Sequence, residues 1–492
     1  MRVNDLMSGL MQDSDFEEII GVGEWWLPTH EEIRIPGEFR FNINGVSQLI
    51  VIGRFGDEQY QEFENLDFPI MCGRTDAGSC VTLFDCKVKD IISYCGKMSH
   101  IRRTIVFGDC WIGNVSFISK ESVCLDKISF GINNLNWWVA DTIFSYDIQD
   151  HGFSTISFAV GEEIVLLDDD RIHVAIMHCP VIQAINPGET KLGIEDHLRV
   201  VLQSKKGTIP YYASTECRIL ADYVDKVYSF LSLLIGENPY LYGLQGEVGH
   251  HTVHLRVMRD IIDRSRHGGM DSLRVLFPRQ IISILNIRDV FAKFMDIYDR
   301  VQQGVNYLVG FNIRSQLYAQ YTLPEAIYNF EGVDSELHED GRKKPSTCLL
   351  GNANKEILDG ILAKCNAKEK TFLNARFKRK TISLKERFSR VLDELRIVFP
   401  YVAGREEGIL TALVSARNRY SHYGRGDCSD QYLYVALVHF VNYITVGLVL
   451  YKSGFPKEII AACLNKVEGD YLGIKYNFER CFGVAKDMEK VK

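Results

Sequence analysis

Arg417, Asn418 and His422 stand within six residues of one another late in the chain, and their chemical types suit the cleavage of RNA. When a 2′-hydroxyl attacks the adjacent phosphate, one group must take up a proton and another must supply one. Histidine serves either step because it titrates near neutral pH. Arginine stays charged and holds phosphate oxygens while negative charge builds on them. Asparagine can orient the imidazole or bind the sugar. This route needs no metal ion and no cofactor, and we expect neither.

The element that must position these residues is an amphipathic helix, predicted from Glu406 to Tyr420. Its apolar stripe recurs at helical spacing and consists of Ile409, Leu413, Ala416 and Tyr420. Arg417 and Asn418 lie off that stripe. On a continuous helix, Arg417 and His422 would be about 140° apart. Gly424 and Gly426 predict that the helix ends nearby. Either His422 lies on a frayed last turn that brings it back toward Arg417, or each pair meets its counterpart across a subunit interface.

The motif lies inside a basic segment of an acidic chain. Residues 366–425 carry fourteen Lys or Arg and six Asp or Glu, a net charge of +8. The whole chain of 492 residues carries −8, so the remainder carries −16. A local basic block of this kind is typical of a surface that binds a polyanion such as RNA. The alternative is a solvated helix face.

The first half of the chain shows the pattern of a β-rich domain. Short apolar runs are separated by turn residues, and Asn44-Gly45 predicts a tight hairpin between residues 38–43 and 48–55. Further strand-like runs are 80–88, 101–110, 154–160, 164–167, 172–178 and 197–202. Because no helices of 10–15 residues alternate with these strands, the pattern favours an antiparallel β-sandwich-like domain over a parallel α/β sheet.

The second half is predicted to be helical. Helical apolar stripes occur at 216–234, 290–309, 315–330, 355–366, 383–398, 406–420 and 431–452, and residues 331–346 are expected to form an exposed polar loop. The predicted fold class is α+β, with an antiparallel β-sandwich-like N-terminal domain followed by an all-α bundle. The expected division is a β-rich domain at 1–212, a helical connector at 213–285, the helical domain at 286–475 and a tail at 476–492.

Two groups of side chains could be taken for metal sites. Cys72, Cys80, Cys86 and Cys95 cluster but contain no CxxC pair. His250, His251 and His254 would place two imidazoles on one helix face, but no HExxH pattern is present. We therefore expect half-buried thiols on neighbouring strands and a surface histidine cluster, with no metal bound. Arg171 and His178, which match a wider Arg–His spacing, are interpreted as structural.

The adjacent tryptophan pairs Trp25-Trp26 and Trp137-Trp138 are informative about the β-rich domain. On a strand, neighbouring side chains point to opposite faces, so one of each pair should be core. The other is either exposed and able to bind a partner, or buried on the second face of a sandwich.

The expected compartment is the cytoplasm, without a membrane anchor. The chain has an odd number of cysteines, thirteen, and its first residues do not resemble a secretory signal. The longest apolar run, residues 432–450, is interrupted by His439, Asn442 and Thr445.

The segment from Arg417 to His422 resembles the R-polar-x-x-x-H signature of HEPN domains, a helical ribonuclease fold. Residues 371–377, followed by a long helix and Phe399-Pro400, resemble the second half of the HEPN domain of ApeA-type abortive-infection proteins. Residues 323–326, Leu-Pro-Glu-Ala, resemble an earlier helix of that domain. One departure is visible: Tyr328-Asn329 stands where that helix commonly carries His-Arg.

The N-terminal half adds a second resemblance to the same family. Residues 23–28 and 35–41 are similar to the β-rich N-terminal domain of ApeA-type proteins. The two resemblances together cover most of the chain.

The resemblance implies an anti-phage ribonuclease that halts the infected host. It implies a dimer or a higher homo-oligomer in which two Arg–His motifs face each other, a cellular RNA substrate with tRNA as a candidate, and a phage-derived trigger sensed by the N-terminal domain. His422 would be the general acid and base, Arg417 would stabilise the transition state, and Asn418 would position them. The residues implied to hold the RNA backbone are Arg419, Arg376, Lys378, Arg379 and Lys380.

A different class of function also fits the pattern. The helical bundle could be a non-catalytic module that docks RNA or a protein partner, with the β-sandwich binding a ligand. The complete Arg-Asn-His set favours the enzyme, because a binding helix does not require a titratable histidine beside arginine and asparagine.

Overall fold

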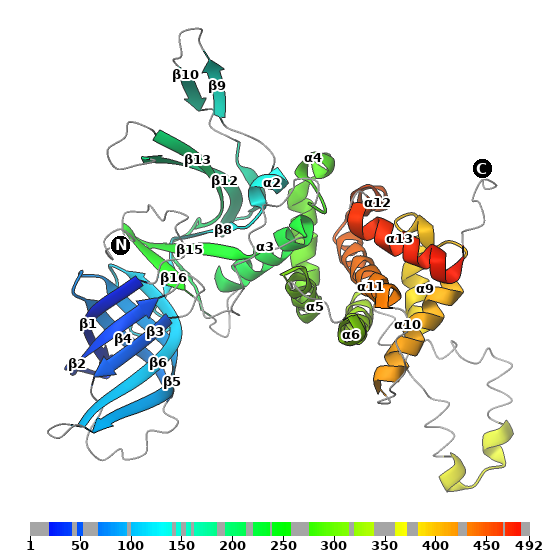
Figure 1. Ribbon diagram of the computed structural model, residues 1–492, viewed down its shortest axis with the longest axis horizontal. Coiled ribbons are helices and arrows are strands. Elements are labelled where there is room, and N and C mark those ends of the chain that lie inside the picture. The colour runs from blue at the N-terminus through cyan, green and yellow to red at the C-terminus, as the bar shows by residue number, and fades with distance from the viewer. Residues whose placement is uncertain are drawn as a thin grey trace. The chain divides into compact units, whose positions relative to one another are not determined.

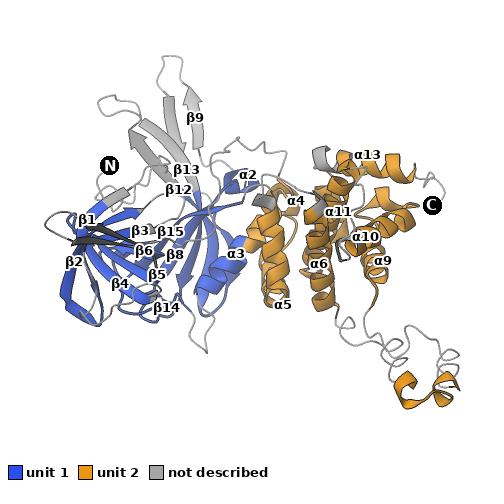
Figure 2. Cartoon of the chain, turned by 60° about the horizontal axis from the view of Figure 1, so that its bottom comes forward, with its two compact units in different colours: residues 1–228, 239–270 blue, residues 229–238, 271–492 orange. Residues whose placement is uncertain are grey.

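The computed structural model describes residues 19–41, 47–52, 67–95, 100–139, 144–148, 154–158, 162–184, 192–212, 220–236, 239–256, 275–313, 319–338, 360–370, 382–421, 431–465 and 468–483. The chain forms two compact units, one of residues 1–228 and 239–270, the other of residues 229–238 and 271–492 (Figure 2). The first unit is built mainly from strands and the second from helices (Figure 1). The predicted fold class, an antiparallel β-rich region followed by a helical region, is confirmed.

The strands of the first unit pair only with antiparallel neighbours in the described residues. In chain order they are β1 (Ile19–Leu27), β2 (His30–Phe41), β3 (Ser47–Ile52), β4 (Asp67–Thr75), β5 (Cys80–Cys95), β6 (His100–Gly113), β7 (Cys124–Leu125), β8 (Lys127–Ile132), β9 (Phe144–Ile148), β10 (Ser154–Phe158), β11 (Ile164–Asp168), β12 (Ile172–Ala184), β13 (Leu192–Ser204), β14 (Ile209–Pro210), β15 (Leu241–Val248) and β16 (His251–Arg256). Twelve of them form one sheet in the order β11-β12-β13-β8-β15-β16-β6-β3-β2-β1-β4-β5.

Strands β1 to β6 form a closed hydrogen-bonded ring, because β5 pairs with both β4 and β6 (Figure 1). Strand β6 is long enough to pair along its other edge first with β3 and then with β16, which links the ring to the rest of the sheet. Because the ring is closed, each of these six strands is paired with a neighbour on both sides, and none is an edge strand. The predicted hairpin is confirmed, with Phe41 of β2 opposite Ser47 of β3. Its connecting residues lie outside the described part of the chain.

The interior of the ring is packed around Trp25, which is fully buried and contacts Phe39 with ring centroids 5.6 Å apart. Strand β4 can lie beside this indole only because a glycine faces it. A Cβ atom added to Gly73 would lie 2.2 Å from the Trp25 ring, and one added to Gly37 would lie 2.8 Å from it. Two glycines, one on each of the strands that flank β1, therefore make room for one large side chain.

We expect Gly73→Ala to lower the free energy of unfolding by about 1–3 kcal/mol, since the added methyl group overpacks a filled core. Urea denaturation followed by circular dichroism measures the change. In a chain that also carries Trp25→Leu, the indole is gone and the cost of Gly73→Ala should largely vanish. Strictly additive costs for the two substitutions would contradict this packing argument.

The two tryptophan pairs behave differently. Trp25 and Trp26, on β1, are both buried, which is the two-sided burial considered above. Trp137 and Trp138 lie on a short helix, α2 (Leu135–Val139), and not on a strand. Trp138 is fully buried whereas Trp137 is 47 % exposed, because successive side chains on a helix point about 100° apart.

The cysteine group lies on neighbouring strands, as expected. Cys72 is on β4, and Cys80 and Cys86 are on β5, while the side chain of Cys95 is outside the described residues. Burial raises the pKa of the Cys72 thiol to about 11 and raises the pKa of Cys86 as well. Cys72 and Cys86 are thus more deeply buried than the half-buried thiols expected from the sequence.

The histidine group does not lie on a helix. His250 is exposed in the turn between β15 and β16, while His251 and His254 are on β16 itself, with His254 buried. No helix brings two of these imidazoles together here, and the expected surface histidine cluster is wrong for His254, which is buried. Within the described ranges, no three His, Cys, Asp or Glu side chains are arranged to hold a metal ion.

The second unit is a bundle whose central member is the most apolar helix, α11. Its helices are α4 (Arg279–Ile282), α5 (Ile287–Ile313), α6 (Ala319–Leu337), α9 (Leu384–Glu394), α10 (Glu406–Ser421), α11 (Gln431–Lys452), α12 (Lys457–Leu464) and α13 (Glu468–Phe482), and α3 (Leu220–Ile235) connects the units in sequence. By length and composition, α11 is a candidate membrane span in the described chain. Most of its apolar window, 72 %, is buried inside the protein, against α5, α6 and α13 among others, as expected of a core helix.

Two sequence-based expectations differ from the structure. The loop predicted at residues 331–346 is wrong over its described part, because α6 continues to Leu337 with Val333 and Asp334 buried. Residues 213–285, expected to be a helical connector, contain the strands β15 and β16 as well as α3 and α4. The exact division of the chain at residues 212, 285 and 475 stays a prediction.

Candidate functional site

Helix α10 carries the Arg-Asn pair on a face turned away from the core. Three members of its predicted apolar stripe are confirmed, since Ile409 and Leu413 are fully buried and Ala416 is nearly so. The side chain of the fourth, Tyr420, lies outside the described residues. Because Arg417 and Asn418 follow Ala416 directly, the helical twist moves them away from that stripe. The Arg417 side chain is 37 % exposed and Asn418 is exposed. Both can therefore meet a ligand from solvent.

Helix α6 places two side chains against the Arg417 guanidinium. Arg417 Nη2 lies 3.6 Å from Glu331 Oε2 in an ion pair, and Arg417 Cζ lies 5.6 Å from the centroid of the Tyr328 ring. The sequence analysis named Tyr328 only as a departure from the family pattern, and it missed Glu331 because it ended the preceding helix at Phe330. Apolar residues at helical spacing beyond that point, Val333 and Leu337, were the signal that the helix continues.

The side chains of the other predicted site residues lie outside the described part of the chain. His422 follows the last described residue of α10, and Arg376, Lys378, Arg379 and Lys380 lie in residues 371–381, outside the described part of the chain. Arg419 is on α10 by its backbone, but its side chain is not described. The meeting of Arg417 with His422, within one chain or across an interface, stays a prediction.

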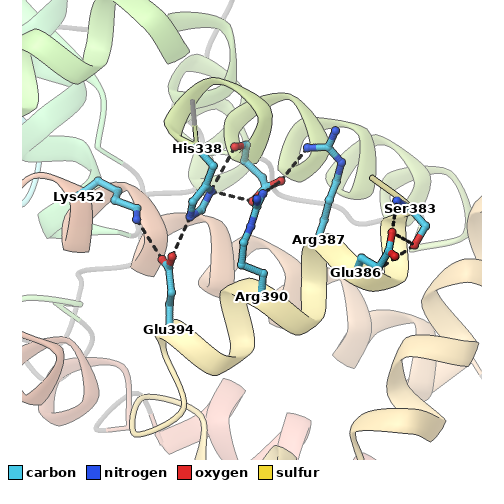
Figure 3. A network of polar contacts seen from close by, with 8 residues as sticks. His338, Ser383, Glu386, Arg387, Arg390, Glu394 and Lys452 are labelled. Carbon is cyan, nitrogen blue, oxygen red and sulfur yellow. Dashed lines mark hydrogen bonds and ion pairs between the residues drawn. The ribbon is translucent and has the colours of Figure 1, made fainter. Parts of the chain in front are cut away.

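A buried polar network fixes the C-terminal end of α6, one turn beyond Glu331 (Figure 3). Asp334 is fully buried and accepts hydrogen bonds from Arg387 Nη1 and Arg390 Nη2 of α9, each at 2.7 Å. His338 follows, with Nδ1 3.0 Å from Asp334 Oδ1 and Nε2 2.9 Å from Glu394 Oε1. Lys452, at the end of α11, completes the chain of contacts at 3.1 Å from Glu394 Oε2. Three helices are thereby joined at one point.

Each ring nitrogen of His338 faces a carboxylate oxygen, an arrangement that favours the form protonated on both nitrogens. Hydrogen bonding to Asp334 raises the pKa of His338, burial opposes this, and the bond to Glu394 adds to the rise. Burial favours the neutral form of Asp334, but the bonds from His338, Arg390 and Arg387 outweigh it and hold the Asp334 pKa below its usual range. The pKa of Glu394 is lowered in the same way by His338 and Lys452.

The stabilising effect of His338 is expected to depend on pH. Its folded-state pKa is raised above the unfolded value of about 6.5, so its contribution is complete below about pH 6.5 and is lost as the pH rises through the folded pKa. The carboxylates of Asp334 and Glu394, whose pKa is lowered, stay ionised across this range. Chemical unfolding of the wild type and His338→Gln between about pH 5.5 and pH 9 should show a difference that shrinks with pH. A difference independent of pH would contradict the assignment, and the exposed His250→Gln is the control.

Part of the basic segment is used by the fold. Arg387 and Arg390 are bound to Asp334, and Arg405 is buried, donating to the carbonyls of Tyr401 and Gly483. On the surface, Arg396 pairs with Asp393. The positive charge available to a polyanion is therefore smaller than the net charge of residues 366–425 indicates.

Family comparisons cover both units. A family model described as ApeA N-terminal domain 1 matches residues 22–285, more than half of the chain. The chain belongs to the ApeA family. A second model, described as Apea-like HEPN, matches residues 323–459 and so includes α9, α10, α11 and most of α6. No curated protein and no solved structure matches the chain.

This membership confirms the resemblance found in the sequence at both ends. The protein is an anti-phage protein of the ApeA type with a HEPN domain. Arg417, Asn418 and the buried network around Asp334 all fall within the HEPN match. The contacts of Arg417 with Tyr328 and Glu331 are thus internal to the HEPN domain.

Proposed function

We propose that this ApeA-family protein is a metal-independent endoribonuclease that cleaves cellular RNA during phage infection. The observation that carries the proposal is the exposed Arg417-Asn418 pair on α10, inside the HEPN match and followed by His422 in the sequence. Arginine and histidine supply the two requirements of cleavage by a 2′-hydroxyl, which are stabilisation of charge on the phosphate and transfer of protons.

In the proposed reaction, His422 takes the proton from the 2′-hydroxyl as its oxygen attacks the adjacent phosphorus. The bond to the 5′-oxygen breaks, and that oxygen receives a proton from His422 or from the second histidine of a dimer. Arg417 binds the phosphate oxygens as charge builds on them, and Asn418 orients the reacting groups. The products are a 2′,3′-cyclic phosphate and a 5′-hydroxyl. Arg419, Arg376, Lys378, Arg379 and Lys380 are proposed to hold the RNA backbone, and tRNA is a candidate substrate.

Regulation is proposed to reside in the β-rich N-terminal unit. A ribonuclease that acts on the RNA of its own host must be inactive until infection, and the remaining domain of the chain is the natural place for a sensor. We propose that a phage-derived component binds there, and that the active form is a cytoplasmic homodimer or a higher homo-oligomer in which two motifs face each other.

The proposal is tested by incubating purified protein with total cellular RNA in excess EDTA, with and without phage lysate. The wild type should cut discrete RNAs and leave cyclic phosphate ends, while His422→Ala should not cut and should bind RNA with an affinity within a few-fold. If both proteins are silent even with lysate and bind RNA equally, the protein is a binding module and the catalytic proposal fails.

A further inference from the structure

Helix α6 supplies two side chains that contact the motif arginine, Arg417. Tyr328 and Glu331 are three residues apart on α6, which places them as neighbours on one helix face. The Tyr328 ring lies within cation–π range of the Arg417 guanidinium, and the Glu331 carboxylate lies at its edge. Between and beside them, Ile327, Phe330 and Val333 are buried in the bundle. The position of this helix face is therefore fixed by the core.

The polar network described above adds to this rigidity. Asp334, three residues after Glu331, is bound by two arginines of α9, and His338 ties the end of α6 to Glu394. Any rotation of α6 that moved Glu331 away from Arg417 would also pull Asp334 out of its buried contacts. The carboxylate is thus presented to Arg417 by an anchored element and not by a loop.

The Arg417 side chain stays accessible to solvent beside these two partners. It is 37 % exposed, while the Glu331 side chain is 21 % exposed. Because part of the guanidinium is exposed, a phosphate can approach Arg417 while Glu331 stays in contact with it.

We propose that Glu331 and Tyr328 are positioning residues for Arg417, which hold its guanidinium in the orientation that receives the phosphate of the RNA at the cleavage site. Glu331 fixes one edge of the guanidinium and Tyr328 supports one face. Because the Arg417 side chain is already ordered in the free protein, it loses less conformational entropy when the RNA reacts. This inference rests on the proposed ribonuclease function.

The test compares initial rates of formation of cyclic phosphate ends on total cellular RNA, over a range of RNA concentrations. Glu331→Gln is expected to lower the maximal rate about ten- to a hundredfold, because a misplaced catalytic group costs rate more than affinity. The RNA concentration that gives half the maximal rate should change less than about twofold. Tyr328→Leu should lower the rate about two- to fivefold, as expected for the loss of an exposed cation–π contact. Tyr328→Phe keeps the aromatic ring, so its rate should be close to that of the wild type.

The matched control is Glu406→Gln, which makes the same charge change at an exposed position in the first turn of α10 and should leave the rate unchanged. A double-mutant cycle then separates positioning from a structural effect. In an Arg417→Ala background, adding Glu331→Gln should cause no further loss, because nothing remains to be positioned.

Three outcomes would overturn the inference. A faster Glu331→Gln enzyme would mean that the carboxylate blocks the site. An equal rate would mean that the contact has no role, and an additive loss in the Arg417→Ala background would mean that Glu331 acts through stability. A wild type that is silent on RNA would instead overturn the proposed ribonuclease function itself, so the two failures are distinguishable.

Discussion

Replacing Arg417 with alanine is expected to slow RNA cleavage by about a hundred- to a thousandfold, the usual effect of removing one preorganised donor from a developing oxyanion. The loss corresponds to about 2.7–4 kcal/mol of transition-state stabilisation. Because this guanidinium acts mainly on charge that builds during the reaction, RNA affinity should fall only a few-fold. Single-turnover rates and RNA binding, measured on the same preparations, separate the two effects.

The control for this prediction removes the same charge elsewhere in the basic segment. Arg396→Ala changes a highly exposed arginine on the surface, where it pairs with Asp393. It is expected to retain a rate close to that of the wild type. If Arg396→Ala and Arg417→Ala were equally slow, Arg417 would contribute only to the general attraction of RNA and not to the chemistry.

The second large effect is expected at Asp334, whose replacement by asparagine should cost about 3–5 kcal/mol of unfolding free energy, the range for breaking a buried ion pair by removing one partner. Asn keeps the shape but removes the charge that Arg387, Arg390 and His338 share. Three cationic groups would then remain together with only Glu394 to offset them. Urea denaturation at neutral pH measures the loss.

The matched control is Asp393→Asn near the end of α9, which makes the same chemical change in an exposed pair with Arg396. Exposed ion pairs contribute about 0–1 kcal/mol, so this variant should be nearly as stable as the wild type. Equal stability losses at Asp334 and Asp393 would show that burial of the network does not matter and would contradict the structure of this region.

Much of the architecture could be predicted from local sequence. The hairpin of β2 and β3, the bounds of α11 and the apolar stripe of α10 follow from alternation and helical spacing, which are encoded within each segment. The closure of β1 to β6 into a ring could not be predicted, because the pairing of β1 with β4 and of β3 with β6 joins residues that lie far apart in the sequence. The strands β15 and β16 were missed because they follow a helix and because two glycines interrupt the alternation of β15.

In the candidate site, too, the features encoded locally were predicted and those that depend on distant residues were missed. Arg417 and Asn418 were found from residue type and helix position, and the structure places both off the buried stripe of α10. Glu331 was assigned to a loop because the residues after it are polar. Asp334 and His338 are polar yet form part of the fold, since their partners on α9 lie more than fifty residues later in the chain. Such non-local ion pairs leave no periodic signature in the sequence.

The measurement that tests the central claim most directly is the mapping of RNA 3′ ends in infected cells. Cells that produce the wild type or His422→Ala at equal levels would be infected with phage, and RNA ending in 2′,3′-cyclic phosphate would be sequenced from each. The account predicts a defined set of new cyclic phosphate ends with the wild type, appearing only on infection and missing with His422→Ala. Identical end profiles in the two cultures, in infections that the wild type restricts, would contradict it.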